Sequence, residues 1–474
     1  MKTVFVTIAA CLLASFITPA SAKITLPSLL SDHMVLQQNT EVKLWGKSDR
    51  KTVSAITSWD NKEYSADVDA DGCWLIKVRT PQAGGPFEIM LTDGTAITLE
   101  DVLIGEVWLC SGQSNMEMPI KGAGGQPVAG SFETLLNVKP QTPIRMAKIA
   151  HRASKKPEEE TEGGWKISSP QHVANATAVG YYFAECLHNM LNIPIGIIDD
   201  SWSGSTIEAW MDREMLKPFV GLTTIDFPET DINEIKRPHR TPQLLYNGMI
   251  APVVNYAIKG VLWYQGESNM GAHAVYERLL PAMVSGWRTK WQQGNFPFYY
   301  VQIPPYQYDG DDALRSALFR EAQTRCLPRI PNSGMAVTID LGERQTVHPP
   351  QKKPIGERLA ALALAKTYKI EGIPCAFPTY RAHERKGNKI TVTFDNAPLG
   401  LKFYGDIHGF EVAGEDRKFY PAQVEIKHIH ATVWSDEVPN PVAVRYGFKN
   451  VPNPTPNLIG VNNLPAAPFR TDNW

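Results

Sequence analysis

The sequence predicts an α/β protein, a mainly parallel β-sheet with helices on both faces that is flanked by an N-terminal and a C-terminal β module. Two observations support this fold class. From about residue 101 to 370, apolar strand-like runs alternate with helical patterns, which is typical of a parallel sheet. On either side, short runs of alternating apolar and polar residues are separated by turns rich in Gly, Pro and Asp, as in antiparallel β modules.

The first 22 residues have the features of a signal peptide. Lys2 supplies a positive charge, residues 4–17 are apolar, and Ala20-Ser21-Ala22 forms a small-residue cleavage site before Lys23. The apolar run is too short for a stable membrane span, and no other apolar run is long enough. We therefore expect an exported protein, periplasmic or secreted, with no integral membrane segment once the signal is removed.

Composition narrows the class of protein. A chain of 474 residues suggests more than one domain, and 43% hydrophobic with 20% charged residues fits a globular protein. A net charge of -2 gives no electrostatic basis for binding nucleic acid or an anionic membrane. Of six cysteines, Cys11 lies in the signal peptide and the others are odd in number and scattered, so they form no disulfide framework. No Cys or His spacing matches a metal site, and we expect neither metal nor cofactor.

The β modules are predicted from runs with a period of two. In residues 23–103, the runs 41–45 and 87–91 alternate in this way, and Gly and Asp turns lie between such runs. In residues 371–474, the runs 389–394 and 441–446 do the same. We predict a sandwich-like N-terminal module and a second C-terminal β module.

The central domain, residues 104–370, is predicted from longer apolar runs. A helical pattern covers residues 179–191. Buried strands are expected before residue 110 and at four further runs, 193–198, 259–264, 298–302 and 334–339. Strands separated by helices indicate a parallel sheet, whose reactive groups collect beyond the carboxyl ends of the strands.

Small or polar residues follow four of these strands. They are residues 112–115, 199–205, 264–269, and 340–343 with the nearby His348. Together they supply most of what acyl transfer requires, namely a nucleophile, a base and donors to an oxyanion.

Each chemical role has a candidate in these turns. Ser114 is the candidate nucleophile and His348 the candidate base, because a serine hydroxyl needs an imidazole to take its proton. The backbone N–H groups of Ser114 and Gly204 and the side-chain amide of Asn269 are candidate oxyanion donors. We also expect Gln113, Gln265 and Glu267, in the same turns, to bind substrate. Each residue alone also fits an ordinary role, a turn for Gly204, a helix cap for Asn269 or a loop position for His348.

At these residues the chain resembles the SGNH hydrolase superfamily and, within it, the sialate O-acetylesterase family. The matching blocks cover nearly the whole mature chain. They are GQSNM at 112–116, SWSGSTIEAW at 201–210, LYNGM at 245–249 with WYQGESN at 263–269, His348-Pro349 followed by Lys352, Gly356, Arg358 and Leu359, and FRTDNW at 469–474.

The resemblance implies an SGNH-type catalytic domain that removes O-acetyl groups from sugars, including sialic acids, without a cofactor. It implies that Ser114 is the nucleophile, that His348 is the base, and that Gly204 and Asn269 line the oxyanion hole. The second block departs from the usual Trp-Gly-Gly-Thr, because here it is Trp202-Ser203-Gly204-Ser205.

A second departure concerns the usual Asp-x-His-Pro, which here is Thr346-Val347-His348-Pro349. Thr346 cannot supply the negative charge that orients and stabilises the imidazole. Glu343 or Asp340 could reach His348 from the same loop. A second alternative is that Asp199 or Asp200 reaches it from another strand end. The third is a Ser–His dyad whose ring is oriented by a backbone carbonyl.

We predict an exported carboxylic ester hydrolase whose substrate is an acetylated sugar or glycan, first of all 9-O-acetylated sialic acid. The alternative substrate is an acetylated plant polysaccharide such as xylan, mannan or pectin, since related folds change substrate readily. A glycan-binding protein without catalysis is a further alternative. Trp202, Trp210, Trp263 and Tyr264 could stack on sugar rings or belong to the core, where large aromatic residues are usually found.

Overall fold

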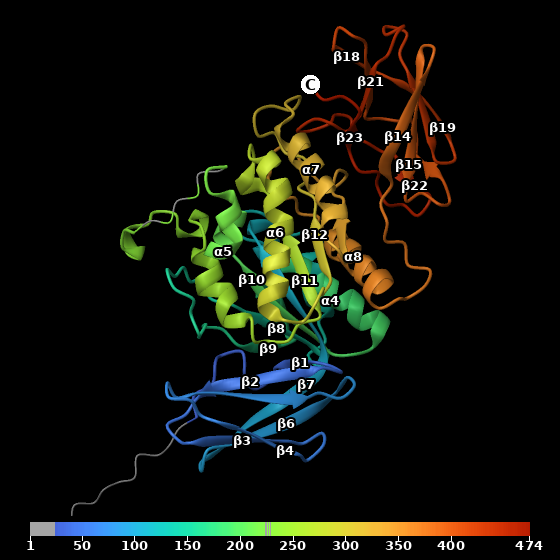
Figure 1. The fold of residues 1–474 in the computed structure, drawn as a ribbon. Helices are drawn as coiled ribbons and strands as arrows, with labels where there is room; N and C mark the ends of the chain where they lie inside the picture. The colour runs from blue at the N-terminus through green and yellow to red at the C-terminus, as the bar shows by residue number, and fades with distance from the viewer. Residues whose placement is uncertain (1–23, 223–224, 226, 228) are drawn as a thin grey trace, which may run out of the picture.

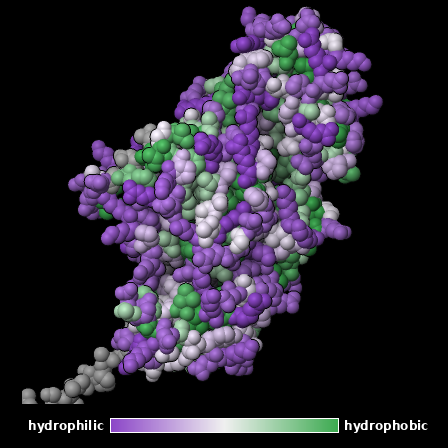
Figure 2. Space-filling view, viewed as in Figure 1, coloured by the Kyte–Doolittle hydropathy of each residue, from purple (hydrophilic) through white to green (hydrophobic). Residues whose placement is uncertain are grey.

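The computed structural model describes residues 24–222, 225, 227 and 229–474 (Figure 1). The predicted signal peptide, residues 1–22, lies outside the described residues. Within these described residues, no helix is both long and apolar enough to cross a membrane. On the face drawn in Figure 2, hydrophilic residues predominate and hydrophobic residues lie in small separate groups.

The N-terminal module consists of antiparallel strands around an apolar core. The predicted runs 41–45 and 87–91 lie in two of these strands, so both predictions are confirmed. The strands are β2 (Glu41–Lys47) paired with β5 (Cys73–Arg79), and β3 (Thr52–Thr57) paired with β4 (Glu63–Asp67) and with β6 (Gly84–Thr92).

One long strand, β7 (Ala96–Gly112), connects this module to the central sheet. Its first half pairs antiparallel with β6, and residues 103–105 pair parallel with β1 (Val35–Gln37). Its second half, residues 106–112, is hydrogen-bonded to strands of the central sheet on both sides. The strand passes through the predicted boundary at residue 103 without a break.

The central sheet is parallel except at one edge, which confirms the predicted α/β fold. The four buried strands expected after residue 190 are all present, and two further strands, β8 and the edge strand β9, were not predicted. The order is β13 (Ser333–Ala336), β12 (Phe298–Val301), β11 (Gly260–Tyr264), β7, β10 (Ile195–Ser201), β8 (Ile144–Lys148) and the antiparallel β9 (Trp165–Ile167).

Helices cover both faces of this sheet, as Figure 1 shows. On one face, Trp108 of β7 packs edge-on against Phe183, with ring centroids 4.9 Å apart. On the other face, Trp263 of β11 packs against Trp287 at 5.8 Å. The first face carries α4 (Ala178–Leu191) and α8 (Lys352–Leu362), and the second carries α6 (His273–Trp291) and α7 (Arg315–Cys326).

The predicted helix at 179–191 is α4, and local signals explain its ends. Thr177 caps the first turn, because its hydroxyl accepts a hydrogen bond from Gly180 N–H at 3.3 Å. Asn192 ends the helix in the left-handed conformation that asparagine tolerates. The long buried face of α4 packs against β10 of the sheet and against α8.

The C-terminal module has its own apolar core and is attached to α7. Ser316 N–H donates to Asn450 at 2.8 Å, and Arg470 pairs with Glu321 at 3.1 Å. Both predicted strands are present. One sheet has the order β14 (Thr379–Lys386), β15 (Lys389–Asp395), β20 (His430–Trp434), β19 (Gln423–Lys427), and another the order β18 (Phe419–Pro421), β17 (Phe410–Ala413), β21 (Ala443–Tyr446), β23 (Phe469–Arg470).

Candidate active site

Ser114 lies where β7 ends at the carboxyl edge of the sheet. The last residue of β7, Gly112, has φ +134°, and a Cβ atom there would collide with the carbonyl group of Tyr264. Only glycine therefore allows the chain to turn so close to the neighbouring strand. Gln113 makes this turn, and Ser114 begins the short helix α1 (Ser114–Glu117).

The imidazole of His348 is in contact with Ser114. Its Nε2 atom lies 2.7 Å from the Ser114 hydroxyl oxygen, and its Nδ1 atom is hydrogen-bonded to Oε1 of Gln126. An amide oxygen only accepts, so this partner assigns the proton to Nδ1 and leaves Nε2 free to accept the serine proton. The pair has the geometry of an activated nucleophile.

The surroundings of His348 favour its neutral form. Burial lowers the pKa of His348 to about 4, and the nearby positive charge of Lys352 acts in the same direction. The ring is therefore unprotonated at neutral pH, as a general base must be.

The two acids predicted on the same loop do not contact His348. Asp340 forms a two-pronged ion pair with Arg358, at 2.5 and 2.8 Å. Glu343 is exposed and forms no hydrogen bond or ion pair with any described residue. Its carboxylate is free to remain in water, where a charged group is most stable.

The two acids predicted from β10 do not contact His348 either. Asp200 is fully buried, neither of its oxygen atoms has a partner among the described residues, and burial raises its pKa well above its usual value. Asp199 accepts a hydrogen bond from the Ser201 hydroxyl at 2.5 Å. The group at Nδ1 of His348 is thus the side-chain amide of Gln126, which none of the three alternatives from the sequence included.

Gly204 lies in a loop that is held beside α1, the helix that Ser114 begins. Trp202 N–H donates to the carbonyl of Gly112 at 3.0 Å, and Ser203 N–H donates to the carboxylate of Glu117 at 2.7 Å. Gly204 itself has φ +74°, a conformation that favours glycine. Its carbonyl accepts a hydrogen bond from Arg240 at 3.0 Å. Donation from Gly204 N–H to an oxyanion stays a prediction.

Asn269 connects the second and third blocks. Its Oδ1 accepts from Ile207 N–H at 3.0 Å and from the amide of Gln265 at 2.8 Å, while its Nδ2 donates to Glu208 at 2.9 Å. The residue lies in the short helix η7 (Glu267–Asn269) and does not cap α6. Its second amide hydrogen is the one available for an oxyanion, and this role also stays a prediction.

The three predicted substrate-binding residues lie beneath the cleft. Gln113 and Gln265 are buried, and so is the carboxylate of Glu267. Gln113 accepts hydrogen bonds from the backbone N–H groups of Gly266 and Ser268, at 3.3 and 3.2 Å. In the structure these side chains fix the turns after β7 and β11 and are not among the residues that line the cleft, and substrate binding by them stays a prediction.

A sealed cluster, formed by Asn115, Glu267 and Lys352, lies directly behind Ser114. Lys352 Nζ donates to Oδ1 of Asn115, whose Nδ2 donates to Glu267 at 2.6 Å and to the carbonyl of Val347 at 3.0 Å. Burial lowers the pKa of Lys352 to about 7 and raises that of Glu267. The amide thus bridges Lys352 and Glu267 and connects the segment of His348 to α1, which begins at Ser114.

A cleft cluster, formed by Glu117, Lys148 and His151, lies on the open side of Ser114. Glu117 contacts His151 at 2.9 Å and Lys148 at 3.6 Å. Burial opposes ionisation of Glu117, but these basic groups and Ser203 N–H lower its pKa to about 2. The cluster lines a cleft of about 570 Å³ that also contains Ser114, Gln126 and His348.

Comparison with known proteins shows the family of this chain. Residues 104–365 match a family model described as a carbohydrate esterase, sialic acid-specific acetylesterase. The solved structure of a carbohydrate acetylesterase from Xanthomonas citri is 34% identical, covers 95% of this chain and 100% of its own, and superposes with a TM-score of 0.86. Sialate O-acetylesterases from Rattus norvegicus and Homo sapiens are each 27% identical, over 72% and 83% of this chain and 73% and 78% of their own.

The chain belongs to the sialic acid-specific acetylesterase family of carbohydrate esterases. It is therefore a carboxylic ester hydrolase, as the sequence predicted.

Most of the aromatic residues near the cleft of this esterase belong to its core. Trp210, Trp263 and Tyr264 are completely buried. Trp202 lines the cleft, but the ring of His151 stacks on it at 4.4 Å and that of His239 lies 6.0 Å away. Of the four predicted stacking residues, only Trp202 is near enough to the cleft to meet a sugar.

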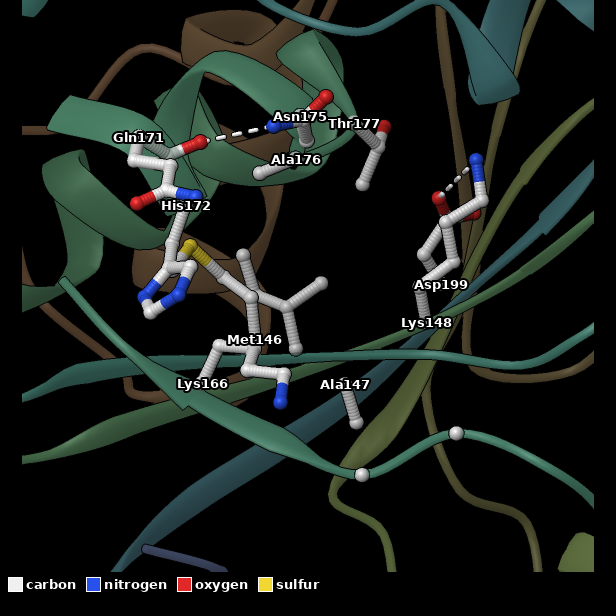
Figure 3. Close-up of a pocket in the computed structure, with 13 residues that line it drawn as sticks. Met146, Ala147, Lys148, Lys166, Gln171, His172, Asn175, Ala176, Thr177 and Asp199 are labelled. Carbon is white, nitrogen blue, oxygen red and sulfur yellow. Dashed lines mark hydrogen bonds and ion pairs between the residues drawn. The ribbon is translucent and has the colours of Figure 1, made fainter. Parts of the chain in front are cut away.

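A second cavity of the esterase, about 430 Å³, adjoins the cleft at Lys148, which lines both. Figure 3 shows Lys148 beside Asp199, whose carboxylate is 3.9 Å from the ammonium group. Burial raises the pKa of Asp199 to about 6. Met146 and Ala147 form an apolar wall, and His172 lies across from Asp199. Among the described residues, no group of three or more His, Cys, Asp or Glu side chains could hold a metal ion.

Sequence reasoning missed two features of this esterase site. Gln126 lies 222 residues from His348 and in a loop without strand or helix, so no spacing signal connects them. Lys352 belongs to the last block, but its link to Glu267 through Asn115 depends on burial that the sequence does not display. The glycines around Gln126 were the one available signal, because they mark a loop shaped for close approach.

Proposed function

We propose that this esterase removes O-acetyl groups from sugars by serine acyl transfer, with Ser114 as nucleophile and His348 as general base. One observation carries the proposal, the 2.7 Å contact between the Ser114 hydroxyl and Nε2 of His348. A contact of this length allows direct proton transfer as the serine attacks.

The reaction has two halves. As Oγ of Ser114 attacks the acetyl carbonyl carbon, His348 takes the serine proton, and it then gives this proton to the departing sugar oxygen. The acetyl group is left on Ser114. Water, deprotonated by the same imidazole, then attacks the acetyl-enzyme; acetate is released as the bond to Oγ of Ser114 breaks, and His348 returns the proton to Oγ. We assign stabilisation of both oxyanions to the N–H groups of Ser114 and Gly204 and to the amide of Asn269.

We propose that the substrate is an O-acetylated sialic acid, first of all the 9-O-acetyl ester. The family description and the names of the curated relatives support this substrate. The basic side chains of Lys148 and His151 line the cleft and suit the carboxylate of a sialic acid. Acetylated xylan, mannan and pectin remain the alternative substrates against which the proposal is tested.

Acetate release from a panel of esters tests the proposal. The panel holds 9-O-acetylated sialic acid, acetylated xylan, mannan and pectin, with Ser114→Ala as the control protein. We expect rapid release from the sialic acid ester and none with Ser114→Ala. Release mainly from a plant polysaccharide would keep the mechanism and overturn the substrate.

Covalent labelling tests the alternative of a glycan-binding protein without catalysis. A fluorophosphonate reacts with a serine that a neighbouring base activates, so we expect wild type to be labelled and Ser114→Ala to be unlabelled. Absence of labelling in both proteins, together with silence across the ester panel, would favour the binding protein.

We also propose that the protein is exported and that residues 1–22 are removed. The charge, apolar run and cleavage site of this segment support export. N-terminal sequencing of protein recovered from the periplasm or the medium should begin at Lys23. Recovery from the cytoplasm with Met1 intact would contradict the proposal.

A further inference from the structure

The second ring nitrogen of His348 has a specific partner, although no carboxylate reaches it. Nδ1 is hydrogen-bonded to Oε1 of Gln126, while Nε2 faces Ser114. The two contacts use both nitrogen atoms and leave the ring one orientation. An imidazole that shuttles protons depends on such a partner to keep the correct tautomer.

The loop that carries Gln126 is shaped and anchored. Gly122, Gly124 and Gly125 all have positive φ, and Gln126 exchanges two backbone hydrogen bonds with Ala123, at 3.0 and 3.1 Å. These constraints fix the place from which the Gln126 side chain projects.

The same loop is also attached to the segment of His348. Ala129 N–H donates to the carbonyl of Pro350 at 2.9 Å, two residues beyond His348, and Val128 is buried. The amide and the imidazole therefore lie on two segments that are hydrogen-bonded to each other. This backbone hydrogen bond holds the two segments together and so keeps Gln126 next to His348.

Thr346 has a different role from the acid that the family resemblance would place there. Its hydroxyl oxygen accepts from the backbone N–H of His348 at 3.1 Å, and the same hydroxyl is 3.3 Å from the carbonyl oxygen of His348. Thr346 thus shapes the backbone and leaves Nδ1 of the ring to Gln126.

We propose that Gln126 is the positioning residue for the catalytic base, an uncharged amide that holds His348 in its Nδ1–H tautomer where a catalytic triad has a carboxylate. The inference rests on the proposed esterase function and deepens it. It defines a Ser–His–Gln arrangement in which the third member supplies orientation without charge.

The missing charge has a chemical consequence. A carboxylate would stabilise the imidazolium that forms when His348 takes the serine proton, whereas an amide oxygen offers only a dipole. From the side of α8, Lys352 adds positive charge that opposes ring protonation.

Other charged groups near the ring have partners of their own or, like Glu343 on the same loop, are exposed to water. Across the cleft, Glu117 pairs with Lys148 and His151, and on the same loop Asp340 pairs with Arg358. The ring is therefore a weak base that stays neutral, and ready to act, in acidic solution.

The experiment compares pH profiles of kcat/KM and kcat for wild type, Gln126→Glu and Gln126→Ala, with a small acetyl ester such as 4-nitrophenyl acetate. Gln345→Glu is the matched control, because it adds the same charge at an exposed position three residues before His348.

We expect Gln126→Glu to move the acid limb upward by about one to three pH units. We expect Gln126→Ala to lower kcat at least about tenfold with little change in KM, a part of what a positioned base supplies. Gln345→Glu should resemble wild type.

Nitrogen-15 NMR of the His348 ring gives a readout that does not depend on activity. In wild type and in Ser114→Ala, we expect the proton on Nδ1 and a ring that titrates below its usual range. Gln126→Glu should raise the midpoint, and Gln126→Ala should lose the single tautomer. These shifts in a protein without esterase activity would keep the inference and overturn the proposed function.

The opposite results would overturn the inference itself. In one such result, Gln126→Glu shifts the acid limb and the ring midpoint no further than Gln345→Glu does. Residue 126 would then not be in contact with the base. A Gln126→Ala protein with wild-type kcat and an unchanged ring tautomer would show the same.

Discussion

The sealed cluster behind Ser114 and the cleft cluster in front of it contain the same kinds of charged group in opposite surroundings. Lys352 and Asn115 are 0% exposed, and Lys352 has lost so much hydration that its pKa falls to about 7. In the cleft cluster, 49% of the Lys148 side chain and 35% of that of His151 are exposed. The pKa of Glu117, which contacts both, is lowered to about 2.

The difference shows that burial decides which charged groups hold the site rigidly and which hold it weakly. Charges removed from water interact strongly and tolerate no missing partner, so the sealed cluster fixes where Ser114 and the segment of His348 lie. Charges near the surface are screened by water and ions, so the cleft cluster holds its loop more weakly and can rearrange around a ligand.

Removal of Lys352 should have the largest effect. Lys352→Met removes the ammonium group that Asn115 bridges to the buried Glu267 carboxylate, and we expect the free energy of unfolding to fall by about 3 to 5 kcal/mol. Urea unfolding at pH 7 measures this change. Lys353→Met, at the exposed neighbouring position, is the matched control and should cost less than about 1 kcal/mol. A Lys352→Met protein as stable as this control would show that the sealed cluster has no structural role.

Removal of Glu117 should have an intermediate effect that depends on pH. Because the folded-state pKa of Glu117 is about 2, below its ordinary 4.5, its stabilising contribution is complete above pH 4.5 and is lost as the pH falls toward 2. Glu117→Gln should therefore lower the free energy of unfolding by about 1 to 3 kcal/mol at pH 7 and by less at pH 3.

Denaturant titrations at the two pH values check this expectation for Glu117. Glu133→Gln, an exposed acid on the helix α2 (Ser131–Asn137), is the control and should show no such trend. A Glu117→Gln defect that is equally large at pH 3 would contradict the expectation.

Removal of Glu343, an acid that belongs to neither cluster, should have the smallest effect. It is exposed and contacts no described residue, so Glu343→Gln should leave kcat within about twofold of wild type. Steady-state rates on the same ester, beside Gln126→Ala, measure the contrast. A loss of tenfold or more would return Glu343 to the role that the sequence left open for it.

The predictions from sequence succeeded where a residue's position follows from the strand that precedes it. Apolar runs such as 259–264 end in turns, and parallel strands bring those turns to one edge, so Ser114 and His348 could be expected near each other. The prediction that Ser114 and His348 lie close together required only the positions of the strands and not the identity of the neighbouring side chains. The structure places them 2.7 Å apart.

The predictions failed where a partner is chosen by packing between distant loops. A carboxylate is the usual third member of a triad and was therefore expected at His348, whereas Gln126 carries no charge. Burial also decides whether Gln265 touches a ligand or braces a turn, and no local pattern distinguishes the two. Such contacts depend on the packing of segments that are distant in the sequence.

The continuity of β7 has a consequence for how this protein can be divided. The strand begins at Ala96 among the strands of the N-terminal module and ends at Gly112, two residues before Ser114. A fragment that starts at residue 104 would expose the cut end of this strand and lose the pairing with β1 and β6. We therefore expect a fragment cut at residue 104 to be less stable than one that retains the N-terminal module, and any truncation, fusion or transplanted version should keep that module with the central sheet.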